Sequence, residues 1–271
     1  MEKKFNTGET NSELREKYNK DGSILRKSQL RMLEMLLYID EVCKQQHIKY
    51  SLDGGNILGA VRHGGFVPWD DDVDIILERK EYKKLCTYLA SHPHPQFVLQ
   101  SPETDPFFIN HWNVLRDLKS EYIQDSEIHR LRKYKGLQID LFPIENNVIP
   151  FFHKSINTLH KFNETYLLRK HNKTSRFLFQ LNAKVVCPLV RGISKLFGNK
   201  KVYYYAYGLP WSRLKFPEEI VFPYSSVEFE KNTFPAPADV PAYLKIQYGN
   251  YMDLPAINNR NHHMANYKIW D

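Results

Sequence analysis

The chain lacks the features that mark several protein classes. Its 271 residues contain three scattered cysteines and no CxxC pair, so neither a disulfide framework nor a zinc-thiolate site is indicated. No run of about 18 apolar residues occurs, which argues against a membrane-spanning helix. The opening MEKKFNTGETNSEL is polar and has no apolar stretch like that of a secretory signal. We therefore expect a cytoplasmic protein.

Acids are scarce in one part of the chain. The whole protein carries +7, but residues 151–202 contain eleven Lys or Arg and one acid, Glu164, so this stretch carries +10 and the remainder −3. Apolar residues there recur at helical spacing, which predicts basic amphipathic helices. Three interpretations stay open: a solvated helical face, peripheral contact with an anionic membrane, or nucleic-acid binding. No nucleic-acid motif accompanies the charge, so we expect no nucleic-acid partner.

The composition, 42% hydrophobic and 25% charged, is typical of a globular protein. Periodicity predicts helices and strands in alternation up to about residue 145. The predicted helices are 28–46, 57–62 and 78–91, and the predicted strands are 48–52, 72–77, 97–100, 107–115, 120–124 and 137–142. After Trp211 the chain is rich in proline and aromatics, and we predict one helix, 238–248, between loops. We therefore expect an α+β fold, a mixed sheet flanked by helices.

No long Gly/Ser linker divides the chain, so we expect one catalytic unit over residues 23–271 after a lead-in over 1–22. Within that unit we place a core sheet at about 23–145 and a basic helical insertion at about 150–205. A C-terminal segment, 206–271, completes it.

Four aspartates occupy five positions directly after Trp69, in WDDDVDII. Because side chains alternate along a strand, Asp72 and Asp74 should share one face. Paired carboxylates at a strand end suit Mg²⁺, which takes oxygen ligands and keeps room for phosphates. Asp140, in the apolar GLQIDLFPI, is the candidate third carboxylate, because an ionised side chain buried there needs a partner. For Asp140, backbone amides are the alternative partner; for Asp70 and Asp71, capping or a supporting role is as plausible as ligation.

A Gly-Gly pair lies upstream of these acids. Gly54 and Gly55 fall between a predicted strand and a predicted helix, where backbone N–H groups and the helix N-terminus can hold a phosphate. Asn56 follows them, and Arg62 could offset diphosphate charge. A simple tight turn is the alternative for the glycines, and an exposed surface role is the alternative for Arg62.

Aromatic side chains could recognise a quaternary ammonium through their ring faces. Trp69, Trp112 and the 17 tyrosines are the candidates, and core packing is the favoured role for Trp69, Trp112 and Tyr134. Four histidines, His92, His94, His262 and His263, lack the spacing of a metal site, so we do not expect one there.

The stretch GGNILGAVRHGGFVPWDDDVDI resembles the signature of the LicD family, phosphocholine transferases of the nucleotidyltransferase superfamily. The segments IDLFPI and YGNYMDLPAINNRNHH also look like family features, so the resemblance covers most of the chain. It implies a nucleotidyltransferase-like fold, with Asp72, Asp74 and Asp140 as catalytic metal ligands for Mg²⁺, Mn²⁺ being the alternative. Gly54 and Gly55 would form the phosphate loop. Asn56 departs from the Ser or Thr common in such loops, but its amide can also bond a phosphate.

The resemblance implies transfer of phosphocholine from CDP-choline to a sugar of a lipid-linked cell-surface glycan precursor, with release of CMP. The acceptor would be a teichoic acid or a lipopolysaccharide, at the inner face of the membrane. The alternatives are transfer of ribitol or glycerol phosphate from a CDP-linked donor, and nucleotidyl transfer to a small molecule or RNA. A non-enzymatic alternative is a basic membrane or nucleic-acid adaptor.

Overall fold

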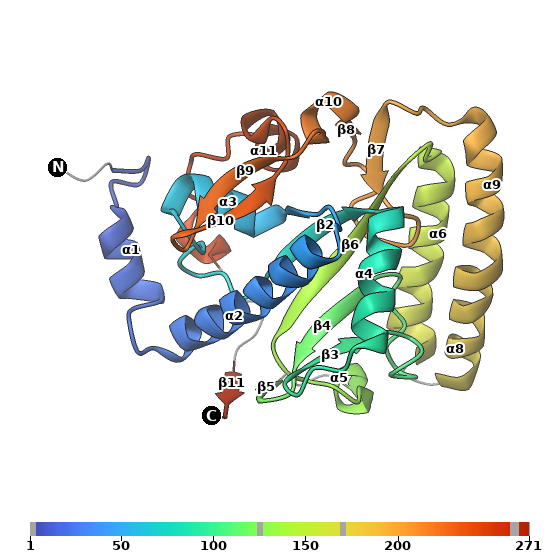
Figure 1. Ribbon diagram of the computed structural model, residues 1–271, viewed down its shortest axis with the longest axis horizontal. Coiled ribbons are helices and arrows are strands. Elements are labelled where there is room, and N and C mark those ends of the chain that lie inside the picture. The colour runs from blue at the N-terminus through green and yellow to red at the C-terminus, as the bar shows by residue number, and fades with distance from the viewer. Residues whose placement is uncertain (1–3, 124–126, 169–171, 261–265, 271) are drawn as a thin grey trace.

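A seven-stranded mixed sheet forms the centre of the protein, and its strands curl around one long strand, β6. The computed structural model describes residues 4–123, 127–168, 172–260 and 266–270 (Figure 1). The strands are β1 (Ser51–Leu52), β2 (Asp74–Glu78), β3 (Phe97–Gln100), β4 (Asn113–Asp117), β6 (Gln138–Asn146), β7 (Val202–Tyr205) and β8 (Phe216–Pro217). The predicted α+β class with a mixed, helix-flanked sheet is confirmed.

Strand β6 has different neighbours along its two edges. On one edge it pairs in parallel with β2. On the other edge, antiparallel β4 covers its first half and antiparallel β7 covers its last residues. The order is β1-β2-β6-β4-β3, with β7 and β8 joined to the far half of β6. A side chain early in β6 therefore lies between β2 and β4, where both of those strands begin.

One face of the sheet packs on the long helix α2 (Ile24–Gln45) and on α4 (Arg79–Ser91), which lie in front of it in Figure 1. Val73, just before β2, and the β2 residues Ile75 and Leu77 belong to this main core. Strand alternation then turns Asp72, Asp74 and Ile76 to the opposite face, as predicted from the sequence pattern.

The opposite face is covered by the last part of the chain. Ile76 and Phe142 pack there with aromatic residues from β7, from β8 and from helix α11 (Val240–Tyr248). Helix α10 (Glu218–Val221) completes this layer, whereas the hairpin of β9 (Ser225–Phe229) and β10 (Asn232–Ala236) packs Phe229 and Phe234 into the main core. The helix predicted at 238–248 is confirmed, and a loop follows it as predicted. The prediction of loops before it is wrong, because β8, α10, β9 and β10 lie there.

A helical layer forms one end of the molecule. It consists of α6 (Pro150–Phe162), the π-helical η1 (Asn163–Leu167), α8 (Asn172–Leu181), the π-helical η2 (Asn182–Val186) and α9 (Cys187–Phe197). Buried Glu145, near the end of β6, ties this layer to the sheet. It accepts hydrogen bonds from Arg79 Nε at 2.5 Å and from Arg191 Nε at 2.9 Å.

Short elements complete the chain. Helix α1 (Asn11–Tyr18) brings Leu14 into the main core, and β5 (Ser120–Ile123) pairs with β11 (Asn266–Ile269). The others are α3 (Gly54–His63), α5 (Glu127–Leu131) and η3 (Ile257–Asn259).

The strand predicted over 107–115 is wrong in its first part, since β4 begins only at Asn113. The Asp105 carboxylate holds a turn there by accepting a hydrogen bond from the Phe107 N–H at 3.0 Å. Among the described residues, no helix is long and apolar enough to cross a membrane.

Candidate active site

The predicted acids meet where β2 and β6 begin. Asp74 and Asp140 are register partners on these parallel strands, so their side chains leave the same face of the sheet. Asn56, on α3, bonds to the backbone at the start of β2 through both ends of its side-chain amide. Its Oδ1 accepts the Asp74 N–H at 2.7 Å, and its Nδ2 donates to the Asp72 carbonyl at 3.4 Å. The amide of Asn56 therefore shapes the acidic turn.

Asp140 is held by side chains. Trp112 Nε1–H donates to its Oδ1, and Gln138 Nε2–H donates to its Oδ2, both at 2.5 Å. These donors are not the backbone amides considered from the sequence. Burial raises the pKa of Asp140 to about 6, although the two hydrogen bonds and the charge of Arg116 act to lower it.

Asp74 is the most crowded acid of the group. Burial raises its pKa well above the usual range, and the negative charges of Asp72, Asp140, Asp53 and Asp70 raise it further. Carboxylates in this arrangement favour a proton or a cation that offsets their repulsion.

The Gly-Gly turn lies against these acids. Gly54 has φ +51°, in the left-handed region that favours glycine, and a Cβ added to it would lie 3.0 Å from Asp74 Oδ2. A Cβ on Gly55 would collide with the Asp70 carboxylate. The two glycines therefore let the start of α3 approach the acidic cluster, and the predicted juxtaposition of glycines and acids is present.

A further acid was missed by the sequence reasoning. Asp53 precedes the glycines and is buried, and it accepts three hydrogen bonds: from Tyr205 Oη at 2.6 Å, Tyr243 Oη at 2.7 Å and Gln247 Nε2 at 2.9 Å. Burial, together with the charge of Asp53, raises the pKa of both tyrosines, so they stay protonated as donors. The only sequence signal for Asp53 is its place in DGGN, because the residues that donate hydrogen bonds to it are more than 150 positions away.

A cavity of about 140 Å³ opens beside the acids. Aromatic residues from the C-terminal layer form much of its wall, and Trp211 adopts a left-handed φ of +65° at its rim. Its indole lies 5.1 Å from the Phe142 ring and 5.0 Å from the Tyr205 ring, measured between centroids. The lining residues are Asp53, Gly54, Asp74, Phe142, Tyr205, Trp211, Leu214, Gln247 and Tyr248. Acidic oxygens and aromatic faces thus meet in one small space.

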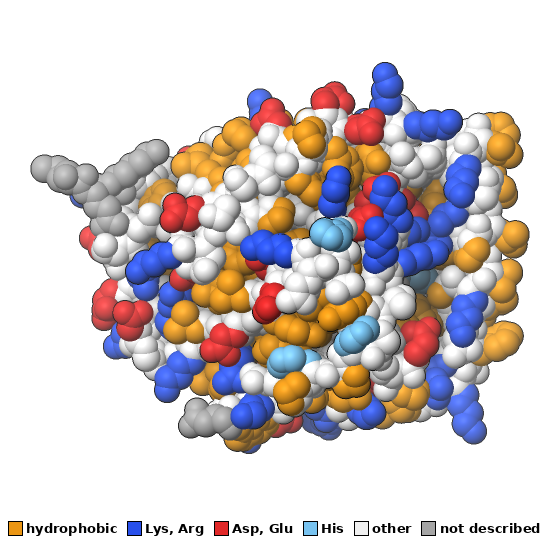
Figure 2. Space-filling view, viewed as in Figure 1, with side chains coloured by type: hydrophobic (Ala, Val, Ile, Leu, Met, Phe, Trp, Pro, Cys, Tyr) orange, Lys and Arg blue, Asp and Glu red, His pale blue; other side chains and the backbone are white. Residues whose placement is uncertain are grey.

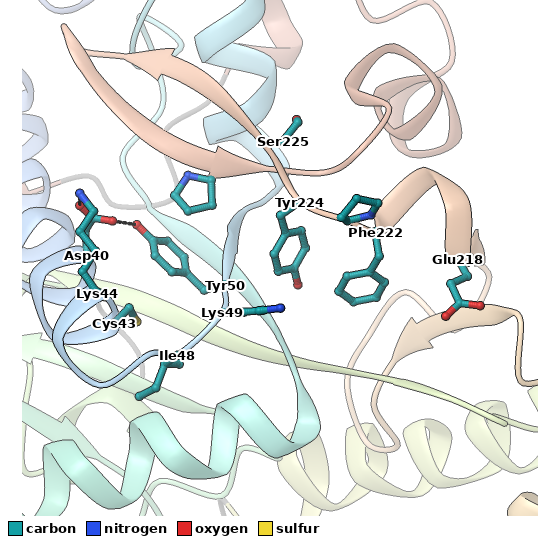
Figure 3. A pocket seen from close by; sticks show the side chains of 12 residues that line it. Asp40, Cys43, Lys44, Ile48, Lys49, Tyr50, Glu218, Phe222, Tyr224 and Ser225 are labelled. Carbon is teal, nitrogen blue, oxygen red and sulfur yellow. Dashed lines mark hydrogen bonds and ion pairs between the residues drawn. The ribbon is translucent and has the colours of Figure 1, made fainter.

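A larger hollow of about 700 Å³ lies elsewhere, between the end of α2, β1 and β9 (Figure 3). It contains none of the clustered acids. Its lining includes two carboxylates, Asp40 and Glu218, of which Asp40 is bonded to Tyr50 Oη at 2.8 Å and to Lys44 Nζ at 2.5 Å. The chemistry of the sequence motifs therefore belongs to the smaller cavity.

Comparison with known families identifies the family to which the chain belongs. The family described as LicD/FKTN/FKRP, nucleotidyltransferase domain, matches residues 47–190, which include all the acids and glycines predicted for the site. The chain belongs to the LicD family. It is therefore a phosphotransferase, and the non-enzymatic adaptor is set aside.

Three relatives show how far the similarity extends. The lipopolysaccharide cholinephosphotransferase LicD of Haemophilus influenzae is 27% identical over 254 residues, covering 88% of this chain and 95% of that protein. An uncharacterized protein of Rickettsia prowazekii is 28% identical over 134 residues, 43% of this chain and 50% of that protein. The human ribitol 5-phosphate transferase FKRP is 45% identical over 42 residues, 16% of this chain and 8% of that protein.

Arg62 is separate from the LicD-type glycine turn. It lies near the far end of α3, eight residues and roughly 12 Å from Gly54 along the helix axis. It is buried, so the alternative of an exposed surface role is wrong. Its Nη1 donates to the carbonyls of Tyr251 at 3.0 Å and Asp253 at 3.2 Å, which anchors the C-terminal segment.

The neighbouring acids have structural partners. Asp71 is buried and accepts a hydrogen bond from the Tyr267 hydroxyl. The Asp70 carbonyl accepts from Gln29 Nε2 at 2.8 Å, which ties the acidic turn to α2. Both residues thus hold the acidic turn in place through these hydrogen bonds.

The aromatic candidates divide between core and site. Trp69 is buried in the main core, and its ring centroid lies 5.9 Å from Arg62 Cζ and 5.0 Å from Arg260 Cζ, so core packing is confirmed for it. Trp112 packs against Phe142, with ring centroids 5.5 Å apart, and also donates a hydrogen bond to Asp140 at the site. Tyr134 has Lys133 Nζ 4.8 Å from its ring centroid.

The histidines considered from the sequence make ring contacts where the structure describes them. His92 stacks on Tyr88, and His94 stacks on Phe97. His262 and His263 lie outside the described residues.

The donor set of the acidic cluster, all carboxylate, fits a hard divalent cation. Within the described part of the chain, no group of three or more His, Cys, Asp or Glu side chains is arranged to hold a metal ion by itself. Mg²⁺, however, is commonly bound by one or two carboxylates together with substrate phosphates and water. The cluster therefore suits a cation that binds together with a nucleotide.

Proposed function

We propose that this protein transfers phosphocholine from CDP-choline to a sugar of a cell-surface glycan precursor and releases CMP. The observation that carries the proposal is the meeting of Asp74, Asp140 and the Gly54 turn beside an aromatic cavity. The similarity to a lipopolysaccharide cholinephosphotransferase over 88% of the chain supports the same reaction.

The donor diphosphate would lie at the glycine turn. Backbone N–H groups at the start of α3 and the positive end of its dipole favour phosphate there. Asp72, Asp74 and Asp140 would hold Mg²⁺, or Mn²⁺, which supplies charge neutralisation on the diphosphate and on the departing CMP. In this arrangement we infer a nucleotidyltransferase-type active site.

The acceptor sugar hydroxyl would attack the phosphorus atom of the phosphocholine group. Its oxygen forms the new P–O bond, the P–O bond to CMP breaks, and CMP keeps that electron pair. Where Asp140 does not ligate the metal, it is the candidate acceptor for the hydroxyl proton, since a carboxyl with a pKa of about 6 can act as a base near neutral pH. Trp112 and Gln138 would orient its two oxygens.

The choline group would bind against the aromatic wall of the cavity. A quaternary ammonium is attracted to ring faces, and Trp211 and Tyr248 border the cavity next to Asp74. The carboxylates at the base of the cavity add favourable negative charge. We assign these two side chains to the choline group.

We place the reaction at the cytoplasmic face of the membrane, on a lipid-linked lipopolysaccharide or teichoic acid precursor. The three cysteines are free and buried, which is compatible with a reducing compartment. The test is incubation of the protein with Mg²⁺, a panel of CDP-alcohols and either precursor. CMP release and the mass of the acceptor are followed by mass spectrometry. Phosphocholine on the acceptor supports the proposal, and pyrophosphate release in place of CMP would indicate nucleotidyl transfer.

A second candidate donor is CDP-ribitol. The 42-residue match to a ribitol 5-phosphate transferase favours it, because the phosphate apparatus can serve either alcohol. CDP-glycerol belongs to the same panel. Turnover that is faster with CDP-ribitol than with CDP-choline would replace choline by ribitol and leave the role of the acids unchanged.

A further inference from the structure

The outer face of the helical layer carries a row of exposed apolar side chains. Between α8 and α9 six of them follow one another at intervals of four residues, with exposed fractions from 41% to 77%. We call this row the apolar ridge; its members are Phe177, Leu181, Val185, Leu189, Ile193 and Phe197. Exposed apolar rows of this kind mark interaction surfaces in soluble proteins.

The π-helical segment η2 reduces the winding of the ridge around the helix. In an α-helix with 3.6 residues per turn, a step of four residues drifts by about 40°, so a long row at this spacing would wind around the helix. A π-helical turn holds more residues and drifts the other way. Because η2 (Asn182–Val186) lies in the middle of the row, it offsets part of this drift, and the row winds less than it would on a continuous α-helix.

The side of α8 and α9 that faces the protein is already occupied. Phe179, Asn182, Cys187 and Ser194 are buried there, and Arg191 turns inward to Glu145. The ridge therefore points to solvent, and Figure 2 shows hydrophobic side chains interspersed with Lys and Arg along the edge formed by this helical end. From Phe177 to Phe197 the ridge runs for roughly 30 Å at a rise of 1.5 Å per residue.

The preceding helix adds apolar surface to the same layer. On α6 and η1 the exposed members are Phe151, Leu159, Phe162 and Tyr166, and the rings of the last two lie 5.3 Å apart. Among the described residues, the helical layer thus exposes five aromatic rings in addition to the aliphatic members of the ridge: Phe151, Phe162, Tyr166, Phe177 and Phe197.

Charge selects the occupant of this face. The stretch 151–202 carries +10 with one acid in it, and Lys173, Lys184 and Lys195 are exposed on the ridge helices. A second copy would bring two faces of +10 together, which repel each other. A nucleic acid would satisfy the lysines but leave the ridge in water. An anionic bilayer satisfies both, because basic side chains contact headgroups while apolar ones enter the acyl boundary.

We propose that the apolar ridge and its lysines form a docking surface for an anionic lipid bilayer, with helices α8 and α9 lying flat in the headgroup region. This surface is distinct from the acidic cavity, and its binding to lipid requires neither donor nor metal. The proposal therefore stands or falls independently of the reaction proposed above.

The test is flotation of the full chain with vesicles of phosphatidylcholine alone or with about one third phosphatidylglycerol. We expect roughly tenfold more protein to float with the anionic vesicles, and we expect high salt to reduce this difference. The triple variant Phe177→Ser, Leu189→Ser, Phe197→Ser should bind the anionic vesicles roughly tenfold less well. A variant with Lys173, Lys184 and Lys195 changed to Gln should lose a similar factor while keeping the ridge.

The matched control removes three exposed apolar residues elsewhere, as Leu30→Ser, Leu118→Ser, Ile257→Ser, and should float like the wild type. Circular dichroism establishes that each variant is folded. Equal flotation with neutral and anionic vesicles, or a ridge variant that floats like the wild type, would overturn the proposal. So would a dimer in sedimentation that the ridge substitutions dissociate, or RNA binding without vesicle binding.

Discussion

The acidic cavity and the helical end depart from the usual arrangement of a folded protein in opposite ways. At the cavity, carboxylates that water would solvate are buried together, and Asp74 is crowded by four other acids. At the helical end, large apolar side chains that a core would bury are exposed, such as Leu196 at 78%. Both arrangements cost stability in isolation. Each becomes favourable when something outside the chain completes it: a cation with phosphates in the first case, a bilayer in the second.

The largest expected effect separates the two regions by function. Asp74→Asn removes one carboxylate from the cluster, so we expect CMP release to fall on the order of a thousandfold. Relief of charge repulsion should leave the melting temperature unchanged or higher. Vesicle flotation should be unaffected, whereas the ridge variant should show the reverse pattern with a water-soluble acceptor. Asp21→Asn, at an exposed acid, is the control, and full activity in Asp74→Asn would remove the cluster from the mechanism.

The glycine turn gives the next largest effect. Gly54→Ala puts a Cβ at positive φ and 3.0 Å from Asp74 Oδ2, so we expect kcat to fall about a hundredfold. Gly64→Ala, at φ +71° with open space around it, is the matched control. Both variants should lose about 1 kcal/mol of folding stability, measured by urea unfolding. Equal kcat values would show that the turn does not position the donor.

Recognition of the choline group should depend on the aromatic ring of Trp211. Trp211→Ala should raise the KM for CDP-choline roughly tenfold and leave the KM for CDP-ribitol nearly unchanged, because only choline carries a quaternary ammonium. Trp270→Ala, at a tryptophan of similar exposure, is the control. An equal rise in the KM for both donors would show that Trp211 shapes the cavity but does not select choline.

Metal and pH should act on the buried acids together. Burial raises the pKa of Asp140 to about 6, above its unfolded value, so its contribution to stability is greatest below pH 4 and is lost as the pH rises through 6. With CDP-choline present, Mg²⁺ should therefore stabilise the protein more at pH 7.5 than at pH 5, by about 1–2 kcal/mol near tenfold its Kd. Differential scanning calorimetry with Mg²⁺ or EDTA measures this, and Asp74→Asn should abolish the Mg²⁺ effect. An identical Mg²⁺ effect at both pH values would contradict it.

The smallest effect lies outside both regions. Glu9 is bonded to Arg260, which lowers the pKa of Glu9 to about 2. The stabilisation is present above pH 4.5 and is lost as the pH falls towards 2, so Glu9→Gln should reduce acid sensitivity in that window by less than about 1 kcal/mol. Acid unfolding followed by fluorescence tests this, with Glu16→Gln, a nearby glutamate, as the control. An unchanged acid profile would show that the pair contributes nothing.

The sequence could predict what local pattern determines. Alternation along β2 placed Asp72 and Asp74 on one face, and the apolar context of Asp140 marked it as the acid needing partners, so their convergence with Gly54 followed. The basic helices were also recognisable from their period. These inferences depend on a few neighbouring residues each.

What depends on distant contacts could not be predicted. The donors to Asp53 come from Tyr205, Tyr243 and Gln247, and no local pattern connects them with DGGN. The role of Arg62 is decided by carbonyls near the C-terminus. The β9–β10 hairpin was missed because Pro235 within β10 weakens the usual strand signal.

Glu145 and Asp140 lie on the same strand, five residues and roughly 17 Å apart. One is the anchor for Arg191 of the ridge helix, and the other belongs to the acidic cluster. A strand hydrogen-bonded along both edges is rigid. Strand β6 would therefore fix the distance between the catalytic acids and a membrane surface bound by the helices. The distance from the membrane at which a lipid-linked sugar acceptor can react would then be a fixed property of the enzyme.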